Sequence, residues 1–282
     1  MKYIFIFFII LFFSGCGKED KKEAIGDINQ QVEYSPAKDK NIQEYNIEQL
    51  KQQSIKRTPC DTISLMEYVL NNYPEGSYLI YFDKTISTSV PRPAVIYTNQ
   101  NGRYVFGIVA KSRPGERLIE TKNIIGFDQS YIDLDSTELG TAFFYLTLFE
   151  CVEENDAFNV VWEAPIPSHG GFNNVTMEKW FYKGIPYLKI NFHYAQGVGH
   201  IDYNYFLVDG LLSQPHLLMT YEGINFKRTI ANIDNDKYPD YYEHIFYDLG
   251  DRVYSNDSVG FVWRAKDSVY VNTRNSRQTR PY

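Results

Sequence analysis

The sequence predicts a mostly β fold of antiparallel, sandwich-like sheets with one short helix near its start. Between residues 78 and 272, short runs rich in β-branched and aromatic residues follow one another, separated by Gly, Asn, Asp and Pro. No helix-length amphipathic segments lie between these runs, so neighbouring strands are expected to pair antiparallel. Aromatic residues make up 16% of the chain, which suits half-buried sheet surfaces.

The helix is expected directly after residue 60. Asp61 and Thr62 are able to cap it, because their side-chain oxygens accept hydrogen bonds from the free N–H groups of a first turn. The apolar residues at positions 65, 66, 69, 70 and 73 fall on one helical face. The run Pro74-Glu75-Gly76 then ends the helix.

The strands that follow are expected to be short. The tetrapeptide Asn99-Gln100-Asn101-Gly102 predicts a hairpin between two of the earliest. The expected strands cover residues 78–82, 94–97, 104–110, 142–152, 158–163, 180–182, 187–194, 200–208, 217–221, 242–247, 259–263 and 269–272. The run 164–171, with two prolines and two glycines, is either a seam between two halves of the 61–282 domain or a long loop inside one sandwich.

The first sixteen residues predict export and lipid anchoring. Lys2 precedes an unbroken apolar run over residues 3–13, which is too short to span a membrane and is typical of a signal peptide. The run closes on Phe13-Ser14-Gly15-Cys16, which resembles a bacterial lipobox. The resemblance implies a signal peptide over 1–15 and a mature N-terminus at Cys16 that carries fatty acids such as palmitate. The alternative is ordinary cleavage with Cys16 a plain thiol.

The residues after Cys16 indicate where the protein is held. Lys18-Glu19-Asp20 resembles the signal that sends some Gram-negative lipoproteins to the outer face of the outer membrane; a merely hydrophilic tether is the alternative. Residues 16–60 are polar and poor in apolar residues, so we expect a flexible tether, although 41–55 has some capacity to form a helix. We therefore expect an outer-membrane, lipid-anchored protein at the cell surface.

Charge and cysteine content fit an exported protein that does not bind nucleic acid. The net charge is −7, and the sequence offers no basic face of the kind that nucleic acid requires. With Cys16 lipidated, Cys60 and Cys151 are an even pair in an oxidising compartment. They either form a disulfide or are two unrelated buried thiols.

The strongest chemical pattern lies in residues 232–243, where oxygen-bearing side chains recur. Calcium binds six to eight oxygens, and carboxylates this close repel one another unless a cation lies among them. The candidate ligands are Asn232, Asp234, Asp236, Asp240 and Glu243, with Tyr238 at the position of a backbone carbonyl ligand. The spacing resembles the EF-hand loop, and Pro-Asp followed by aromatic residues resembles the strand-joining loops of adhesin-like and FG-GAP-type repeats. A polar surface turn is the alternative.

Two residues depart from the EF-hand pattern. Asn232 stands where Asp is usual, and Lys237 replaces the glycine of the sharp turn. A lysine in the left-handed region is strained by about 1 kcal/mol, and its charge opposes a cation. We therefore expect moderate affinity, suited to millimolar external calcium, and a structural role.

No motif of a reaction stands out in the sequence. Ser168-His169-Gly170-Gly171 is similar to an esterase oxyanion loop, but the chain has no Gly-x-Ser-x-Gly nucleophile elbow. His193, His200 and Asp202 are able to face one another across strands, but no metal motif accompanies them. We expect a non-enzymatic binding module for a glycan or a protein, stabilised by calcium. The alternatives are a cell-envelope hydrolase and a structural subunit of an outer-membrane complex.

Overall fold

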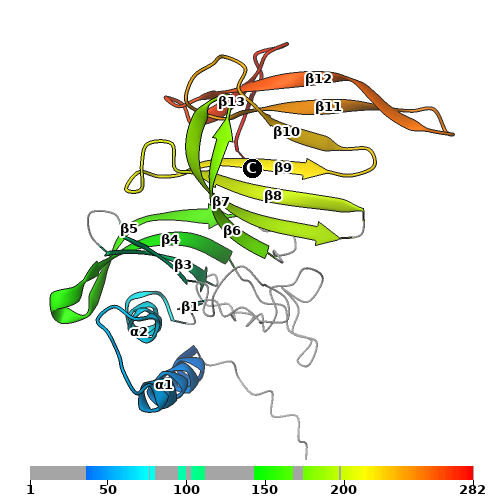
Figure 1. The fold of residues 1–282 in the computed structure, drawn as a ribbon. Helices are drawn as coiled ribbons and strands as arrows, with labels where there is room; N and C mark the ends of the chain where they lie inside the picture. Colours follow the sequence, from blue (N-terminus) through cyan, green and yellow to red (C-terminus); the bar gives the residue numbers. More distant parts are fainter. Residues whose placement is uncertain are drawn as a thin grey trace, which may run out of the picture. The chain divides into compact units, whose positions relative to one another are not determined.

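The computed structural model describes residues 36–75, 77–79, 95–99, 103–111, 143–167, 174–196 and 198–281. All of these residues belong to one compact unit, Ser35–Tyr282. They form two antiparallel sheets and two α-helices, which confirms the mostly β fold (Figure 1). The expected signal peptide, Cys16 and the first part of the expected tether lie outside the described residues. Residues 168–171 of the seam at 164–171 lie outside them as well.

Helix α2 (Thr62–Asn72) forms where the sequence predicts it. The Asp61 side chain caps its first turn by accepting a 2.9 Å hydrogen bond from the Ser64 N–H. Leu65, Val69 and Leu70 are buried on one side of the helix. The amphipathic spacing of these residues therefore directs α2 onto a sheet.

Helix α1 (Pro36–Gln53) lies within the segment 16–60 that was expected to be a flexible tether. Ile47 is buried, and Lys51 Nζ lies 2.9 Å from a Glu48 carboxylate oxygen and 2.8 Å from one of Glu67 on α2. Contacts with α2 thus support the helix. The amino-acid composition of residues 16–60 alone does not reveal these contacts. Helical structure is accordingly present before Asp61, where the folded domain was expected to begin.

The smaller sheet contains the strands that follow α2. They are β1 (Tyr78–Leu79), β2 (Val95–Asn99), β3 (Arg103–Lys111), β4 (Phe143–Val152) and β5 (Ala157–Ile166), with a 3-10 turn, Glu153–Asn155, between the last two. The sheet order is β1-β3-β4-β5, and β2 also pairs with β3. Asn99 pairs with Arg103, so β2 and β3 are the two arms expected around the 99–102 turn.

The larger sheet is a meander in which each strand pairs with the next one in sequence. Its strands are β6 (Asn174–Tyr182), β7 (Ile185–Gln196), β8 (Gly199–Phe206), β9 (His216–Glu222), β10 (Lys227–Ala231), β11 (Asp240–Asp248), β12 (Val253–Arg264), β13 (Val269–Asn272) and β14 (Gln278–Thr279). Strands β10 and β14 were not expected. Both are short and mainly polar, so neither shows the apolar alternation of a strand.

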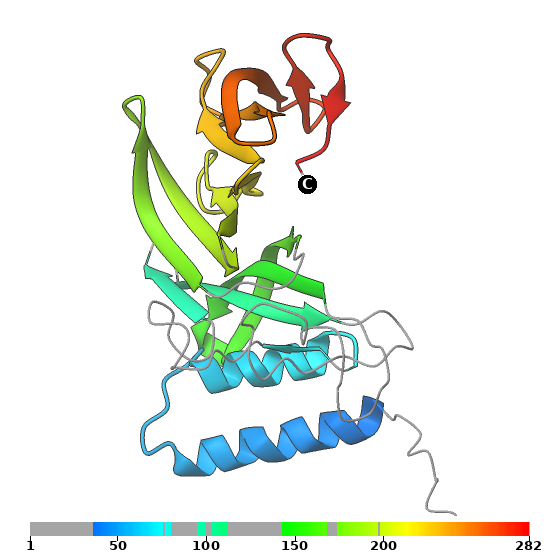
Figure 2. The same ribbon diagram turned by 90° about the vertical axis from the view of Figure 1, so that its right-hand side faces the viewer.

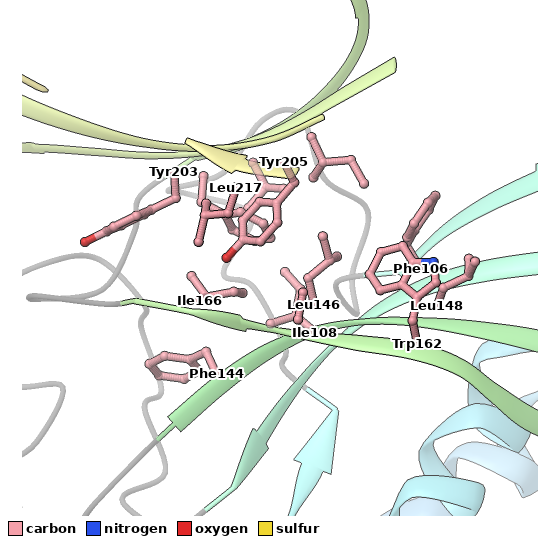
Figure 3. Packing of buried hydrophobic residues seen from close by; sticks show 14 of the residues in the cluster. Phe106, Ile108, Phe144, Leu146, Leu148, Trp162, Ile166, Tyr203, Tyr205 and Leu217 are labelled. Carbon is pink, nitrogen blue, oxygen red and sulfur yellow. The ribbon is translucent and has the colours of Figure 1, made fainter. Parts of the chain in front are cut away.

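The two sheets share a hydrophobic core (Figure 3). Side chains of β3, β4 and β5, among them Phe106 and Leu146, pack with side chains of β7, β8 and β9, among them Tyr205 and Leu217. Two hydrogen bonds reinforce this contact. Trp162 Nε1 donates to the Leu211 carbonyl at 2.8 Å, and the Tyr205 hydroxyl donates to the Pro165 carbonyl at 2.5 Å.

Helix α2 covers the other face of the smaller sheet (Figure 2). At its start, Cys60 is disulfide-bonded to Cys151 of β4, with a Cα–Cα distance of 5.9 Å. The Ser64 hydroxyl donates to an Asp156 carboxylate oxygen at 2.7 Å, which adds a polar tie to the β4–β5 turn. The structure thus brings together the two cysteines that the sequence left as candidates, and they fasten α2 to the sheet.

Removing this disulfide is expected to destabilise the protein strongly. The bond closes a loop between residues 91 apart, and a loop of that length is worth about 3–5 kcal/mol in the unfolded chain. We expect the free energy of unfolding, measured with urea, to be lower by that amount in the double variant Cys60→Ala/Cys151→Ala. A reductant should destabilise the wild type similarly and leave the double variant unchanged. A loss below about 1 kcal/mol would contradict this assignment of the disulfide's role.

Candidate functional site

The candidate site is the loop of residues 232–239, which joins β10 to β11, together with Asp240 at the start of β11. The Asp240 side chain is fully buried. One of its carboxylate oxygens accepts a 2.6 Å hydrogen bond from the Ile233 N–H, and the other accepts a 2.8 Å bond from the Trp263 N–H of β12. Burial raises the pKa of Asp240 to about 6, so its negative charge is only partly compensated by these donors.

Asn232 stands at the other end of the loop and is also buried. Its side-chain Nδ2 donates to the Asp236 carbonyl at 2.9 Å, so the amide faces the loop. Its Oδ1 is buried and has no hydrogen-bond partner among the described residues. Since buried polar atoms nearly always have a partner, this oxygen makes the loop a candidate binding site.

Asp234 and Asp236 lie between these two residues. Asp234 Oδ1 accepts from the Asp236 N–H at 3.1 Å, and Asp236 Oδ1 accepts from the Tyr238 N–H at 2.7 Å. Burial raises the pKa of Asp236, and the negative charge of Asp234 raises the pKa of both Asp236 and Asp240. Asp234 is therefore close enough to repel each of the other two carboxylates, as the spacing predicted.

The structure does not bring Glu243 to the loop. Glu243 is three residues beyond Asp240 on β11, so its side chain is on the opposite face of the strand. There it accepts from the Tyr221 hydroxyl at 3.2 Å and from the Arg228 guanidinium at 3.3 Å. The last ligand position of an EF-hand is displaced here because the chain continues as a strand, whose side chains alternate.

The concern about Lys237 is not borne out by the backbone. The left-handed residue of the loop is Asn235, with φ 64°, a residue type that tolerates this conformation. Lys237 instead forms an ion pair with Asp209, which also accepts a 2.6 Å hydrogen bond from the Tyr238 hydroxyl. The lysine charge is thus paired with a residue outside the loop.

Other parts of the larger sheet hold the loop in place. Lys183 Nζ donates to the Asn232 carbonyl at 2.6 Å, and the Tyr187 hydroxyl donates to the Lys237 carbonyl at 3.0 Å. Sequence reasoning missed Lys183, Tyr187 and Asp209. No local signal marks them, because they lie more than twenty residues from the loop and meet it only after the sheet has formed.

His216 forms a buried contact at the end of the same loop. Its Nε2 lies 2.9 Å from the Pro239 carbonyl oxygen and 2.9 Å from the Tyr270 hydroxyl of β13. Burial lowers the pKa of His216 to about 4, so the ring is neutral near pH 7. Sequence reasoning missed this residue too, because a single histidine in a strand carries no pattern.

The residues His193, His200 and Asp202 do come together, on β7 and β8. His193 Nδ1 lies 2.7 Å from Asp202 Oδ1, and His200 Nε2 lies 3.6 Å from Asp202 Oδ2. Asn191 Nδ2 also donates to the same Asp202 oxygen at 3.1 Å. Within the described ranges, however, no three or more His, Cys, Asp or Glu side chains are gathered so as to hold a metal ion. In the loop, carboxylate oxygens instead face backbone N–H groups.

A groove of about 400 Å³ opens on the C-terminal part of the larger sheet. It lies on the face of β11 that carries Glu243, opposite the face that carries Asp240. Its lining residues come from β11, β12, β13, β14 and the turn before β14; they are Glu243, His244, Ile245, Val259, Phe261, Asn272, Asn275, Arg277 and Thr279. Apolar and hydrogen-bonding side chains therefore meet in one concave surface.

Comparison with known proteins gives no match. No protein-family model, no curated protein and no solved structure matches the chain. Among the described residues, neither helix has the length and apolar character needed to cross a membrane. Function has to be argued from the residues of the site.

The buried His216 predicts a specific pH dependence of stability. The unfolded histidine takes up a proton near pH 6.5, whereas the folded one does so only near pH 4. The stability due to the neutral ring is therefore present above pH 6.5 and is lost as the pH falls toward 4. From pH 7 to pH 5 we expect the wild type to lose about 2 kcal/mol more than His216→Gln in urea unfolding.

This comparison isolates the histidine. Asp240 titrates in a similar range with the opposite sign, but it is present in both proteins and cancels in the difference. Equal pH dependence of the wild type and His216→Gln would contradict the low pKa of the buried ring.

Proposed function

We propose that this chain is a non-enzymatic binding module, lipid-anchored at the cell envelope, whose larger sheet is stabilised by calcium and binds a glycan. The observation that carries the calcium assignment is the buried, unpartnered Oδ1 of Asn232. It belongs to a loop that contains three carboxylates, and Asp234 repels the other two. A cation would be a partner for the Asn232 oxygen, and its positive charge would compensate the negative charges of the carboxylates.

The donor set favours calcium over softer metals. The side chains that face the loop are those of Asn232, Asp234, Asp236 and Asp240, all of which offer oxygen, the ligand atom of hard cations. Glu243 is not among them, and a loop without the bidentate Glu of an EF-hand suits weak, millimolar sites. Binding requires Asp234 and Asp236 to exchange backbone N–H partners for the cation.

Two features favour glycan binding over glycoside hydrolysis: the groove and the pairing of carboxylates elsewhere in the chain. Two glutamates of the sheets are each paired with a lysine: Glu163 lies 2.6 Å from Lys111 Nζ in the smaller sheet, and Glu178 lies 2.9 Å from Lys189 Nζ in the larger one. A glycosidase instead uses two carboxyl groups that flank one cleft. The groove offers an aromatic and aliphatic floor with polar walls, which is the composition of a sugar site.

Calcium is expected to raise the melting temperature of the protein. At about ten times its dissociation constant, a ligand that binds only the folded state adds about 1.4 kcal/mol, which for a domain of this size is about 3–6 °C. Thermal unfolding of the wild type with calcium and with a chelator measures this shift. Asp236→Ala should show no shift.

Asp251→Ala is the matched control, because Asp251 is an exposed aspartate in the β11–β12 turn, away from the loop. It should retain the full calcium shift. A wild type that melts at the same temperature with calcium and with the chelator would rule out the calcium site.

If Cys16 carries the lipid anchor, substituting this cysteine should release the protein from the membrane fraction. Labelled palmitate fed to expressing cells should be incorporated into the wild type, and the protein should sediment with membranes. Cys16→Ala should lose both properties, whereas Cys60→Ala/Cys151→Ala should keep the label. Label retained by Cys16→Ala would show that another residue is acylated.

A further inference from the structure

The free hydrogen-bonding groups of the groove are mainly donors. The Asn272 Oδ1 accepts from the Arg274 N–H at 2.8 Å and from the Asn275 N–H at 3.2 Å. The Asn275 Oδ1 accepts from the Arg277 N–H at 3.0 Å. These backbone donors fix the orientation of both amides, because only the oxygen is able to accept. Each side chain is left with its NH₂ group available.

Arg277 adds a charged donor to the same wall. Two neighbouring arginines are already paired, Arg274 with Asp257 and Arg228 with Glu243. In the part of the chain that the structure describes, the Arg277 guanidinium has no carboxylate partner and is exposed at the groove. It therefore retains the five N–H donors and the fork geometry that bind a carboxylate in bidentate fashion.

The acid in the groove does not cancel this charge. Glu243 is engaged by the Tyr221 hydroxyl and by Arg228, whose guanidinium also lies 4.1 Å from the Tyr241 ring centroid. Since Arg228 balances Glu243, the charge that remains at the wall is that of Arg277. The wall of the groove therefore carries a positive charge that is available to an anionic ligand.

The floor supplies an apolar surface below these donors. Phe261 is almost completely buried and stacks on its cross-strand partner Tyr241 with ring centroids 4.6 Å apart, so its position is fixed from the side. Val259 and Ile245 continue the floor along β12 and β11. A flat molecule with one apolar face is able to lie on this floor while its rim meets the donors.

We propose that the groove binds an acidic sugar, a hexuronate residue of a polysaccharide, and this proposal rests on the glycan-binding function proposed above. The carboxylate pairs with Arg277, and ring oxygens accept from the Asn272 and Asn275 amides. The C–H face of the pyranose lies on the partly exposed side chains of Val259 and Ile245, next to Phe261. A volume of about 400 Å³ is within the range of small-ligand sites and suits one or two sugar rings.

The test compares acidic and neutral sugars of the same size. Full-length protein in detergent is applied to an array of glucuronate, galacturonate and mannuronate oligosaccharides beside their neutral hexose counterparts. The dissociation constant of the best ligand of each kind is then measured by calorimetry. We expect the dissociation constant of the uronate to be at least about tenfold lower than that of its neutral counterpart, because the binding free energy of one charge-assisted hydrogen bond corresponds to a factor of that size.

Three variants assign the preference to the groove. Arg277→Gln removes the charge, and Asn275→Asp replaces the NH₂ donor by a repelling carboxylate while keeping an acceptor for the Arg277 N–H. Both should weaken uronate binding about tenfold or more. Arg277→Gln should leave neutral sugars unaffected, whereas Asn275→Asp should weaken them as well, because it removes a donor to oxygens that both kinds of sugar carry. Arg264→Gln is the matched control, because Arg264 is an exposed arginine at the end of β12 outside the groove, and it should bind like the wild type.

The outcomes separate this inference from the broader proposal. Binding of neutral glycans without a uronate preference, or uronate binding that Arg277→Gln leaves unchanged, overturns the acidic-sugar site and leaves glycan binding standing. An array without any bound glycan overturns both. All variants alter exposed side chains, so unchanged melting temperatures verify that the fold is intact.

Discussion

The buried carboxylate of Asp240 is the interaction on which the C-terminal half of this structure depends. It accepts from Ile233 and Trp263 and so fastens the 232–239 loop to β12. The backbone leaves room for this contact at Gly260, where an added Cβ would lie 2.8 Å from Ile233 Cδ1. Through Pro239 the loop then meets His216 and Tyr270, so one carboxylate links β9, β11, β12 and β13.

The candidate site and the groove occupy opposite faces of one strand. Asp240 directs its side chain to the loop, and Glu243, on the other face of β11, contributes to the groove. Beyond β10, strands β11 and β12 continue as a long hairpin (Figure 1), with Asp248 paired to Val253 near its end. In the proposed account, a cation at the loop stabilises the register of β11 and β12 and thereby the floor on which a sugar would lie.

Sequence reasoning succeeded where the deciding interaction is local. The cap at Asp61, the apolar face of α2 and the alternation in β3 and β4 depend on residues within one element, so spacing reveals them. It failed where the partner is distant. Helix α1 pairs through Lys51 with Glu67 of α2, the loop pairs through Lys237 with Asp209, and Glu243 turns away because β11 begins at Asp240. These contacts exist only after strands far apart in the chain have paired.

The most direct test of the central claim is a crystal structure grown in calcium. The account predicts an ion coordinated by the Asn232 Oδ1 at 2.3–2.6 Å, the distance usual for calcium and oxygen, together with carboxylate oxygens of Asp234 and Asp236. Glu243 should remain with Arg228. A structure in which the Asn232 Oδ1 meets only water or a protein donor, with no ion in the loop at saturating calcium, would contradict it.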